Sequence, residues 1–324
     1  MRQWWTVPGP TGGRLELREV DEPAPGRGEL LVRVAGAGVN RGELIARPAL
    51  KSDNPKAKAY PSGAEFAGTI AAVGEGVTGR AVGDRVMGRG QACYADFTVV
   101  AAEAAMSVPS HLSDVQAAAI PNVFVTAHDA VVTNAEVKPG ETVLITAGSS
   151  GVGTAAIQIA RHLGAGSVAV TTRSPAKEAS LRELGATDVI NTNGQDWAEV
   201  ITQSCGPVDV VIDQVGGSIF SDVLSTMGLG GRFIGVGRNG GAMGKIDLDY
   251  LARKRLRLIG VTFRTRTPAE TLACSERFAE DLLECFDDDR LRPVLDRTFP
   301  LEELADAHHY MLGNTQLGKI VMVP

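Results

Sequence analysis

The stretch VLITAGSSGVGTAAIQIA at residues 143–160 decides the fold of this 324-residue chain. It reads as a short apolar strand, a turn of glycines and serines, and a helix with apolar residues at helical spacing. Glycines let a backbone approach a pyrophosphate closely, and the helix that starts there offers unbonded N–H groups and its positive dipole end. The stretch therefore predicts the first unit of a dinucleotide-binding domain, beginning 142 residues into the chain.

The sequence on either side of this stretch predicts two domains. Residues 1–122 alternate short apolar runs with Gly and Pro, which favours a β-rich, barrel-like domain. Residues 123–263 alternate strands with helical patterns, which is typical of a parallel sheet. The six strands of a complete doubly wound fold are expected at 142–146, 167–171, 188–191, 208–212, 232–236 and 257–261.

The sequence after Phe263 has no place in a finished six-stranded sheet. It predicts a helix at 269–286, a strand at 291–297, a helix at 301–312 and a strand at 319–323. We expect these elements to return to the first domain. The predicted organisation is thus a discontinuous catalytic domain, residues 1–122 and 264–324, and a cofactor domain, residues 123–263.

Composition and charge exclude several classes of protein. The net charge of -6 offers no general basic field for nucleic acid, and the basic residues at 253–257 fit a solvated helix end. The four cysteines have no C-x-x-C spacing, which argues against a zinc knuckle or a disulfide framework. With no signal peptide and no long apolar run, we expect a soluble, cytoplasmic protein that binds neither nucleic acid nor membrane.

The end of the second predicted strand favours NADPH as the cofactor. NAD sites place an acid about twenty residues after the glycine turn, whereas NADP sites use cations for the 2'-phosphate. This strand ends Thr172, Arg173, and the following residues include Lys177 but no acid. Ser174 and Pro175 look like an N-cap and a first helical residue, so both cations are expected to reach one phosphate.

A second interpretation comes from Tyr250 and Lys254, which form the Tyr-x-x-x-Lys pair used by short-chain dehydrogenases. Those enzymes begin with the glycine motif, whereas this chain places 145 residues before it. We therefore interpret Tyr250 as a helix residue with a coincidental lysine one turn on.

Several motifs together resemble the medium-chain dehydrogenase/reductase superfamily along the whole chain, and within it the zinc-independent, ζ-crystallin-like quinone oxidoreductases. The resemblance is carried by residues 35–44, 74–77, 82–87, 147–158, 291–299 and 317–321. It implies an α/β protein with a discontinuous GroES-like β-barrel catalytic domain and a six-stranded Rossmann domain. It also implies a homodimer.

The same resemblance implies an enzyme without zinc. Asn40 stands where zinc-dependent relatives have a cysteine, Gly63, Ala64 and Glu65 replace a Gly-His-Glu motif, and the four-cysteine lobe is missing. A lone glutamate makes no tetrahedral zinc site. Without that Lewis acid, hydride must go to an acceptor that is already electron-poor, such as a quinone or an α,β-unsaturated carbonyl compound.

The resemblance places Asn40 near the nicotinamide. Arg264 follows the last predicted strand of the sheet, where an arginine could hold a carbonyl oxygen or a cofactor phosphate or form a surface salt bridge. Asn40 and Arg264 are the expected catalytic residues, since an amide or guanidinium can stabilise charge on the acceptor oxygen. Thr126 is expected at the nicotinamide, and Thr192 replaces an aromatic residue found near the adenosine phosphate in some relatives. The full expected cofactor set is Asn40, Thr126, Ser149, Ser150, Gly151, Val152, Thr172, Arg173, Lys177, Thr192, Gly235, Val236, Gly237 and Phe263.

Two alternatives to an NADPH-dependent quinone or enone reductase remain open from the sequence. One is a catalytically silent NADPH-binding protein that acts as a sensor or structural protein. The other is an enoyl-thioester reductase. The physiological acceptor and the proton donor are not identified by these motifs.

Overall fold

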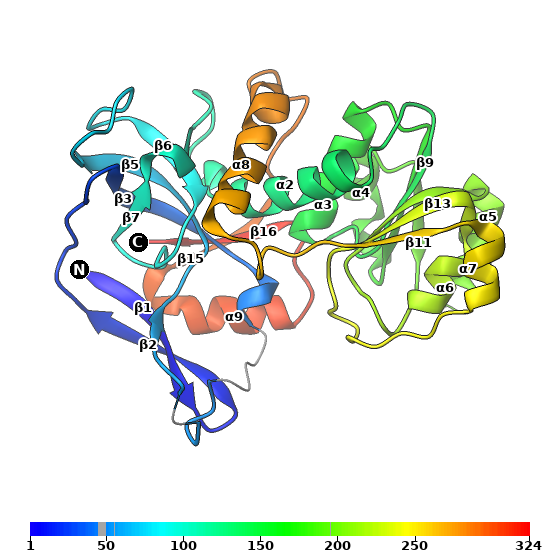
Figure 1. The fold of residues 1–324 in the computed structure, drawn as a ribbon, viewed down its shortest axis with the longest axis horizontal. Helices are drawn as coiled ribbons and strands as arrows, with labels where there is room; N and C mark the ends of the chain where they lie inside the picture. The colour runs from blue at the N-terminus through cyan, green and yellow to red at the C-terminus, as the bar shows by residue number, and fades with distance from the viewer. Residues whose placement is uncertain (45–49, 55, 195) are drawn as a thin grey trace. The chain divides into compact units, whose positions relative to one another are not determined.

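The computed structural model describes residues 1–44, 50–54, 56–194 and 196–324, and its contacts divide the chain into two compact units (Figure 1). Unit 1 comprises Met1–Asn122, Ser275–Asp287 and Pro293–Pro324, and unit 2 comprises Val123–Cys274 and Asp288–Arg292. Residues 264–274 thus group with unit 2, although the sequence assigned them to the catalytic domain. The roles of the two domains remain predictions.

Unit 2 holds the parallel sheet that the glycine turn predicted. Its six strands run in the order β11-β10-β9-β12-β13-β14. Each predicted strand is present, although β13 begins five residues early. The strands are β9 (Thr142–Ile145), β10 (Ser167–Thr172), β11 (Asp188–Asn191), β12 (Val208–Asp213), β13 (Met227–Gly235) and β14 (Arg257–Gly260).

Helices follow most of these strands, and the strand order reverses direction at β9, the first strand of the sheet in the sequence. The helices are α3 (Gly151–His162), α4 (Glu178–Glu183), α5 (Trp197–Cys205), α6 (Phe220–Ser225) and α7 (Leu248–Lys254). Strands β9 and β12 are neighbours, while β10 and β11 lie on one side and β13 and β14 on the other. Such a reversal of strand order leaves a crevice beyond the carboxyl ends of the strands, where ligands of open α/β sheets bind.

Unit 1 is built from strands, as expected, and includes the last strand of the chain. Its larger sheet has the order β15-β16-β3-β5-β6-β8, with β7 also paired to β3, and a smaller sheet has the order β2-β1-β4. Strand β16, red in Figure 1, pairs antiparallel with blue β3. The strands are β1 (Arg2–Gly9), β2 (Gly12–Glu19), β3 (Glu29–Val39), β4 (Tyr60–Pro61), β5 (Glu65–Val73), β6 (Arg85–Arg89), β7 (Phe97–Ala101), β8 (Ala105–Ser107), β15 (Leu295–Pro300) and β16 (Lys319–Val323).

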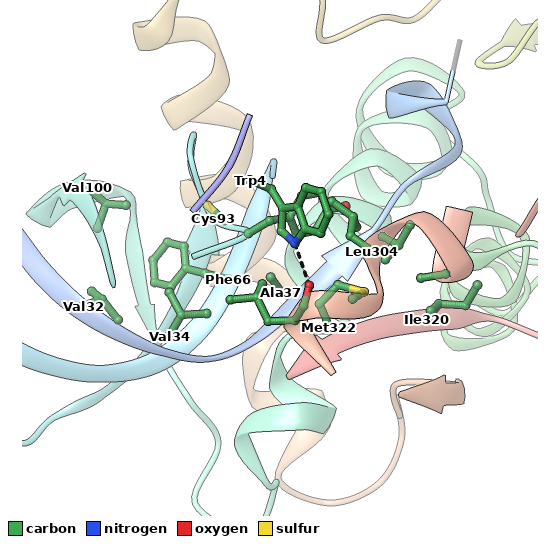
Figure 2. Packing of buried hydrophobic residues seen from close by; sticks show 14 of the residues in the cluster. Trp4, Val32, Val34, Ala37, Phe66, Cys93, Val100, Leu304, Ile320 and Met322 are labelled. Carbon is green, nitrogen blue, oxygen red and sulfur yellow. Dashed lines mark hydrogen bonds between the residues drawn. The ribbon is translucent and has the colours of Figure 1, made fainter. Parts of the chain in front are cut away.

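The core of unit 1 joins residues from both ends of the chain (Figure 2). The indole Nε1 of Trp4 donates to the carbonyl of Leu301 over 2.6 Å, which satisfies the one polar atom of a buried ring. Phe66, from β5, and Met322, from β16, are both fully buried in the same cluster. The last thirty residues therefore contribute to the core formed by the first hundred.

The remaining helices correct two predictions. The helix expected at 269–286 is α8 (Pro268–Leu282) followed by a 3-10 turn, Leu283–Phe286. The prediction of a strand at 291–297 was wrong in its first half, since the strand begins at Leu295. The backbone N–H and carbonyl of Arg292 bond to the side chain of Gln158 instead of to a neighbouring strand. The others are α1 (Asp114–Ala117), α2 (Pro121–His128), a π-helical turn Asp129–Asn134, and α9 (Leu304–Leu312), which the 3-10 turn Leu301–Glu303 precedes.

Across the described residues, no helix combines the length and the apolar character that a membrane span requires.

Candidate active site

The glycine turn of unit 2 presents backbone donors that no described residue of the chain uses. Ser150 caps α3 by accepting the N–H of Gly153 over 3.0 Å. The N–H groups of Gly151 and Val152, which open the helix, have no acceptor among the described residues. Unbonded N–H groups at a helix N-terminus suit an anionic phosphate. The predicted residues Gly151 and Val152 thus have the geometry that a pyrophosphate needs.

Backbone crowding explains why the turn needs glycine. A Cβ on Gly153 would lie 2.6 Å from the carbonyl oxygen of Ala147 and 2.7 Å from that of Gly148. A Cβ on Gly148 would lie 2.9 Å from Cβ of Val170 on the next strand. The turn therefore packs directly on the ends of β9 and β10, and side chains would push it away from a ligand.

A buried polar network that the sequence analysis missed supports this turn. The hydroxyl of Thr146 donates to Asp213 over 2.6 Å, and the side-chain amide of Gln214 donates to the Thr146 carbonyl over 2.9 Å. Ser150 also lies within 2.6 Å of Gln214 Oε1, to which its hydroxyl donates. Burial raises the pKa of Asp213. The signal in the sequence was a polar residue directly after each of two apolar strands, β9 and β12.

The residues expected around the adenosine phosphates lie at or after the ends of β10 and β11. The N–H of Thr192 donates to the carbonyl of Thr172 over 3.0 Å, so these two residues are adjacent. Arg173 is exposed, and its guanidinium forms no ion pair within the described ranges. Ser174 is the N-cap of a 3-10 turn, Pro175–Lys177, so Lys177 precedes α4 instead of lying in its first turn.

The end of β13 brings its backbone close to β12. The N–H groups of Val236 and Gly237 donate to the carbonyl of Asp213 over 2.8 and 3.0 Å. A Cβ on Gly237 would lie 2.2 Å from the carbonyl oxygen of Gln214, so only glycine fits there. Gly235 is partly exposed at the carboxyl end of the strand. These three expected residues line the edge of the sheet where ligands of such folds bind.

An ion pair holds the loop that follows β14. Arg266 bonds to Asp129 over 2.6 Å, and Asp129 is only 1% exposed. The same guanidinium lies 4.7 Å from the ring centroid of Phe263, an expected cofactor residue. Arg264 is exposed, and Thr126 lies half-buried in α2, close in sequence to Asp129. The sequence analysis missed Arg266 and Asp129, which no motif distinguishes from surface charges.

In unit 1, Asn40 belongs to a closed polar cluster of Asn40, Glu65, Asn122 and Lys319. The side-chain amide of Asn40 donates to Glu65 Oε1 over 2.9 Å and to the Gly38 carbonyl over 3.1 Å. Its oxygen accepts from Asn122 Nδ2 over 2.6 Å and from Lys319 Nζ over 2.9 Å. All the hydrogen-bonding positions of the amide are therefore used within unit 1. Its expected donation to an acceptor oxygen would require one of these bonds to break.

Lys319 is the member of the Asn40 cluster that the sequence analysis did not identify. It is 3% exposed and bonds to Glu65, 0% exposed, over 2.7 Å. Its other two bonds go to Asn40 and to the Val39 carbonyl, 2.8 Å away, so all three ammonium hydrogens are used. In the described part of the chain, no three His, Cys, Asp or Glu side chains form a possible metal site. The absence of a metal remains a prediction from the sequence.

Tyr250 has none of the geometry of a catalytic tyrosine. Its hydroxyl donates to the carbonyls of Ser225 and Met227, over 3.0 and 3.3 Å. Lys254 lies over the tyrosine ring, 5.6 Å from its centroid, instead of at the hydroxyl. Burial raises the pKa of this tyrosine. These contacts agree with the interpretation of Tyr250 as a structural helix residue.

Comparisons with known proteins agree with both folds. Residues 26–110 match the family described as alcohol dehydrogenase GroES-like domain, and residues 151–281 match the family described as zinc-binding dehydrogenase. Human quinone oxidoreductase is 31% identical over 95% of this chain and 93% of its own length. The spectinabilin polyketide synthase system protein NorB of Streptomyces orinoci is 33% identical over 98% of this chain, which spans only 14% of NorB.

A solved structure extends the likeness to three dimensions. The structure of the quinone oxidoreductase of Escherichia coli, complexed with NADPH, superimposes on this chain with a TM-score of 0.88 at 25% sequence identity. The superposition covers 100% of both chains. The fold, the relatives and the matched families agree with the resemblance found in the sequence. The chain belongs to the medium-chain dehydrogenase/reductase superfamily and is a nicotinamide-dependent oxidoreductase.

Proposed function

We propose that this protein is an NADPH-dependent, metal-independent reductase that transfers hydride to a quinone or an α,β-unsaturated carbonyl compound. The observation that carries the proposal is the pairing of an open phosphate-binding turn with Arg173 at the end of β10, where an acid would select NAD. NADPH, when bound, supplies the hydride.

Residues of unit 2 would hold the cofactor. The N–H groups of Gly151 and Val152 would bond to the pyrophosphate, and Arg173 would bond to the 2'-phosphate. At the nicotinamide end we assign Thr126, the backbone of Gly235 to Gly237, and Phe263. The remaining expected residues, Ser149, Ser150, Thr172, Lys177 and Thr192, complete the predicted site.

The acceptor needs stabilisation of charge on its oxygen rather than activation by a metal. Arg264, exposed after β14, is our candidate donor to that oxygen. Asn40 is the second, although its amide is already bonded inside unit 1, which favours a role in shaping the site. A homodimer is also part of this proposal, because β14 is an edge strand and its Leu258 is 41% exposed.

The direct test is NADPH oxidation, followed by absorbance, with a panel of quinones, enones and enoyl thioesters. We expect turnover with quinones or enones and a preference for NADPH over NADH. Fastest turnover with enoyl thioesters would instead support the thioester reductase. Tight NADPH binding without turnover on any acceptor would overturn the reductase proposal in favour of a silent binding protein.

A further inference from the structure

Gln214 is a buried glutamine directly after β12, and both its backbone and its side chain bond to other segments of unit 2. Its backbone N–H donates to the hydroxyl of Thr146 over 2.8 Å, and its side-chain amide donates to the Thr146 carbonyl over 2.9 Å. Its side-chain oxygen accepts the hydroxyl of Ser150 over 2.6 Å, and its carbonyl accepts the side-chain amide of Asn239 over 3.0 Å. Four bonds to three segments therefore hold this residue in one position.

The directions of these bonds follow from the groups that make them. The Thr146 carbonyl can only accept, so the amide nitrogen of Gln214 faces it and the amide oxygen faces Ser150. That oxygen can also only accept, so the Ser150 hydroxyl donates its single hydrogen to Gln214. The lone pairs of the hydroxyl are then left for the N–H of Gly153, 3.0 Å away. Gln214 thus makes the Ser150 side chain an acceptor at the start of α3.

This orientation determines which N–H groups at the start of α3 stay unbonded. The N–H of Gly153 bonds to the Ser150 hydroxyl, and that of Thr154 bonds to the Ser150 carbonyl over 2.9 Å. The N–H groups of Gly151 and Val152 have no acceptor within the described ranges. The two donors that we assign to the pyrophosphate are therefore the ones that the Ser150 cap leaves unbonded, and their direction depends on where Ser150 is held.

The turn before α3 needs support, because Ala147 has a backbone conformation that alanine rarely adopts. Its φ is 50°, in the left-handed region that favours glycine. Such a conformation persists only where the surrounding structure fixes it. Both polar atoms of the peptide group before this residue are bonded, the Thr146 carbonyl to Gln214 and the Ala147 N–H to the hydroxyl of Thr171 over 3.0 Å. Gln214 thus supplies one of the two bonds that fix this peptide group.

We propose that Gln214 is a positioning residue for the cofactor, an inference that rests on the proposed cofactor site. Its side chain holds the Thr146 carbonyl and the Ser150 hydroxyl at a fixed separation. The turn between them then directs the N–H groups of Gly151 and Val152 toward the pyrophosphate. Because the Gln214 side chain is buried and bonded at both ends, it acts through Ser150 and the turn rather than by contact with the phosphate.

The test compares wild type with Gln214→Leu, which keeps a side chain of similar size without its hydrogen bonds. We expect the dissociation constants of NADPH and NADH, from fluorescence titration, each to rise about tenfold, the value of one or two neutral hydrogen bonds. The two should change equally because both cofactors carry the pyrophosphate. With the best acceptor of the panel, KM for NADPH should rise by the same factor while kcat stays within about twofold, because the support is the same before and during hydride transfer.

Gln158→Leu is the matched control, since Gln158 is a second buried glutamine of unit 2. Its amide donates to the carbonyls of Thr154 and Arg292, and its oxygen accepts the N–H of Arg292. Neither Gln214 nor Ser150 takes part in these bonds. We expect a comparable loss of stability in urea unfolding but unchanged constants for both cofactors. Equal weakening by the two leucine variants would assign the effect to general destabilisation and overturn the positioning role.

A double variant tests whether Gln214 acts through Ser150. Ser150→Ala alone should weaken both cofactors, because it removes the side chain that Gln214 holds. Combined with Gln214→Leu, it should weaken them no further than the more affected single variant, because both changes remove the same support. Fully additive effects on the dissociation constants would overturn the inference that Gln214 acts through the cap of α3.

The binding measurements separate this inference from the proposed function. A wild type that binds neither cofactor would overturn the cofactor site itself. A wild type that binds NADPH, with unchanged constants in Gln214→Leu, would overturn only the positioning role, whether or not an acceptor is reduced. If Gln214→Leu does not fold, Gln214→Glu decides, because its carboxylate keeps an oxygen for Ser150 but has no N–H for the Thr146 carbonyl. It should weaken both cofactors at least tenfold, and unchanged constants would count against Gln214.

Discussion

The two polar regions of this protein use their hydrogen bonds in opposite ways. In unit 1, Asn40, Glu65 and Lys319 bond to one another until almost no donor or acceptor is left. In unit 2, the N–H groups of Gly151 and Val152 are left without an acceptor among the described residues. A cluster whose bonds are all used internally stabilises the fold, whereas unbonded N–H groups can bind a ligand. We therefore expect substitutions in the Asn40 cluster to lower the stability of the protein and substitutions around the glycine turn to weaken cofactor binding.

The largest effect is expected at Lys319, the cation of the closed cluster. Lys319→Met would leave the carboxylate of Glu65 buried without its counter-ion, which costs about 3 to 5 kcal/mol of unfolding free energy. Urea unfolding followed by circular dichroism measures this loss. Lys138→Met, on an exposed lysine, is the control and should change stability by less than about 0.5 kcal/mol.

A second substitution shows whether the loss comes from the unpaired charge. Glu65→Gln in the Lys319→Met background removes that charge, and its one amide oxygen can still accept either from Asn40 or from the backbone of Asn122, which bond to different oxygens of the carboxylate. We expect the double variant to be more stable than Lys319→Met alone. If the double variant were less stable, the lost packing of the lysine stem rather than the unpaired charge would explain the loss of stability in Lys319→Met.

The sequence predicted the open region much better than the closed one. The turn at 148–153 is local, since a strand, glycines and a helix follow one another within eighteen residues, so its geometry can be derived from the sequence. The Asn40 cluster joins side chains up to 279 residues apart, from β5, β16 and the start of α2. No local pattern distinguishes Lys319 from a surface lysine until β16 is paired with β3. The same holds for Arg266 and Asp129, which bond to each other although they lie 137 residues apart in the sequence.

The next largest effect is expected at Arg173 in unit 2, and it tests whether the cofactor site prefers NADPH to NADH. Arg173→Ala should weaken NADPH by about 10- to 100-fold, the value of a charge-assisted hydrogen bond, and leave NADH almost unchanged. Fluorescence titration with each cofactor measures both constants. Arg182→Ala, an exposed arginine of the following helix that pairs with Glu178, should affect neither. Equal weakening of NADPH and NADH by Arg173→Ala would remove the assignment to the 2'-phosphate.

The smallest effect is expected at Gly153, where, unlike at Arg173, the binding of NADPH and NADH should change to the same extent. Alanine would place its Cβ 2.6 Å from the carbonyl oxygen of Ala147, so the turn must shift and its free N–H groups with it. Overpacking of this kind costs about 1 to 3 kcal/mol. Because both cofactors share the pyrophosphate, we expect NADPH and NADH to weaken equally, by about tenfold. Gly260→Ala, where nothing lies within 4 Å of the new Cβ, is the matched control. Unchanged binding in Gly153→Ala would mean that the open N–H groups do not contact the ligand, and the contrast between the two regions would lose its functional meaning.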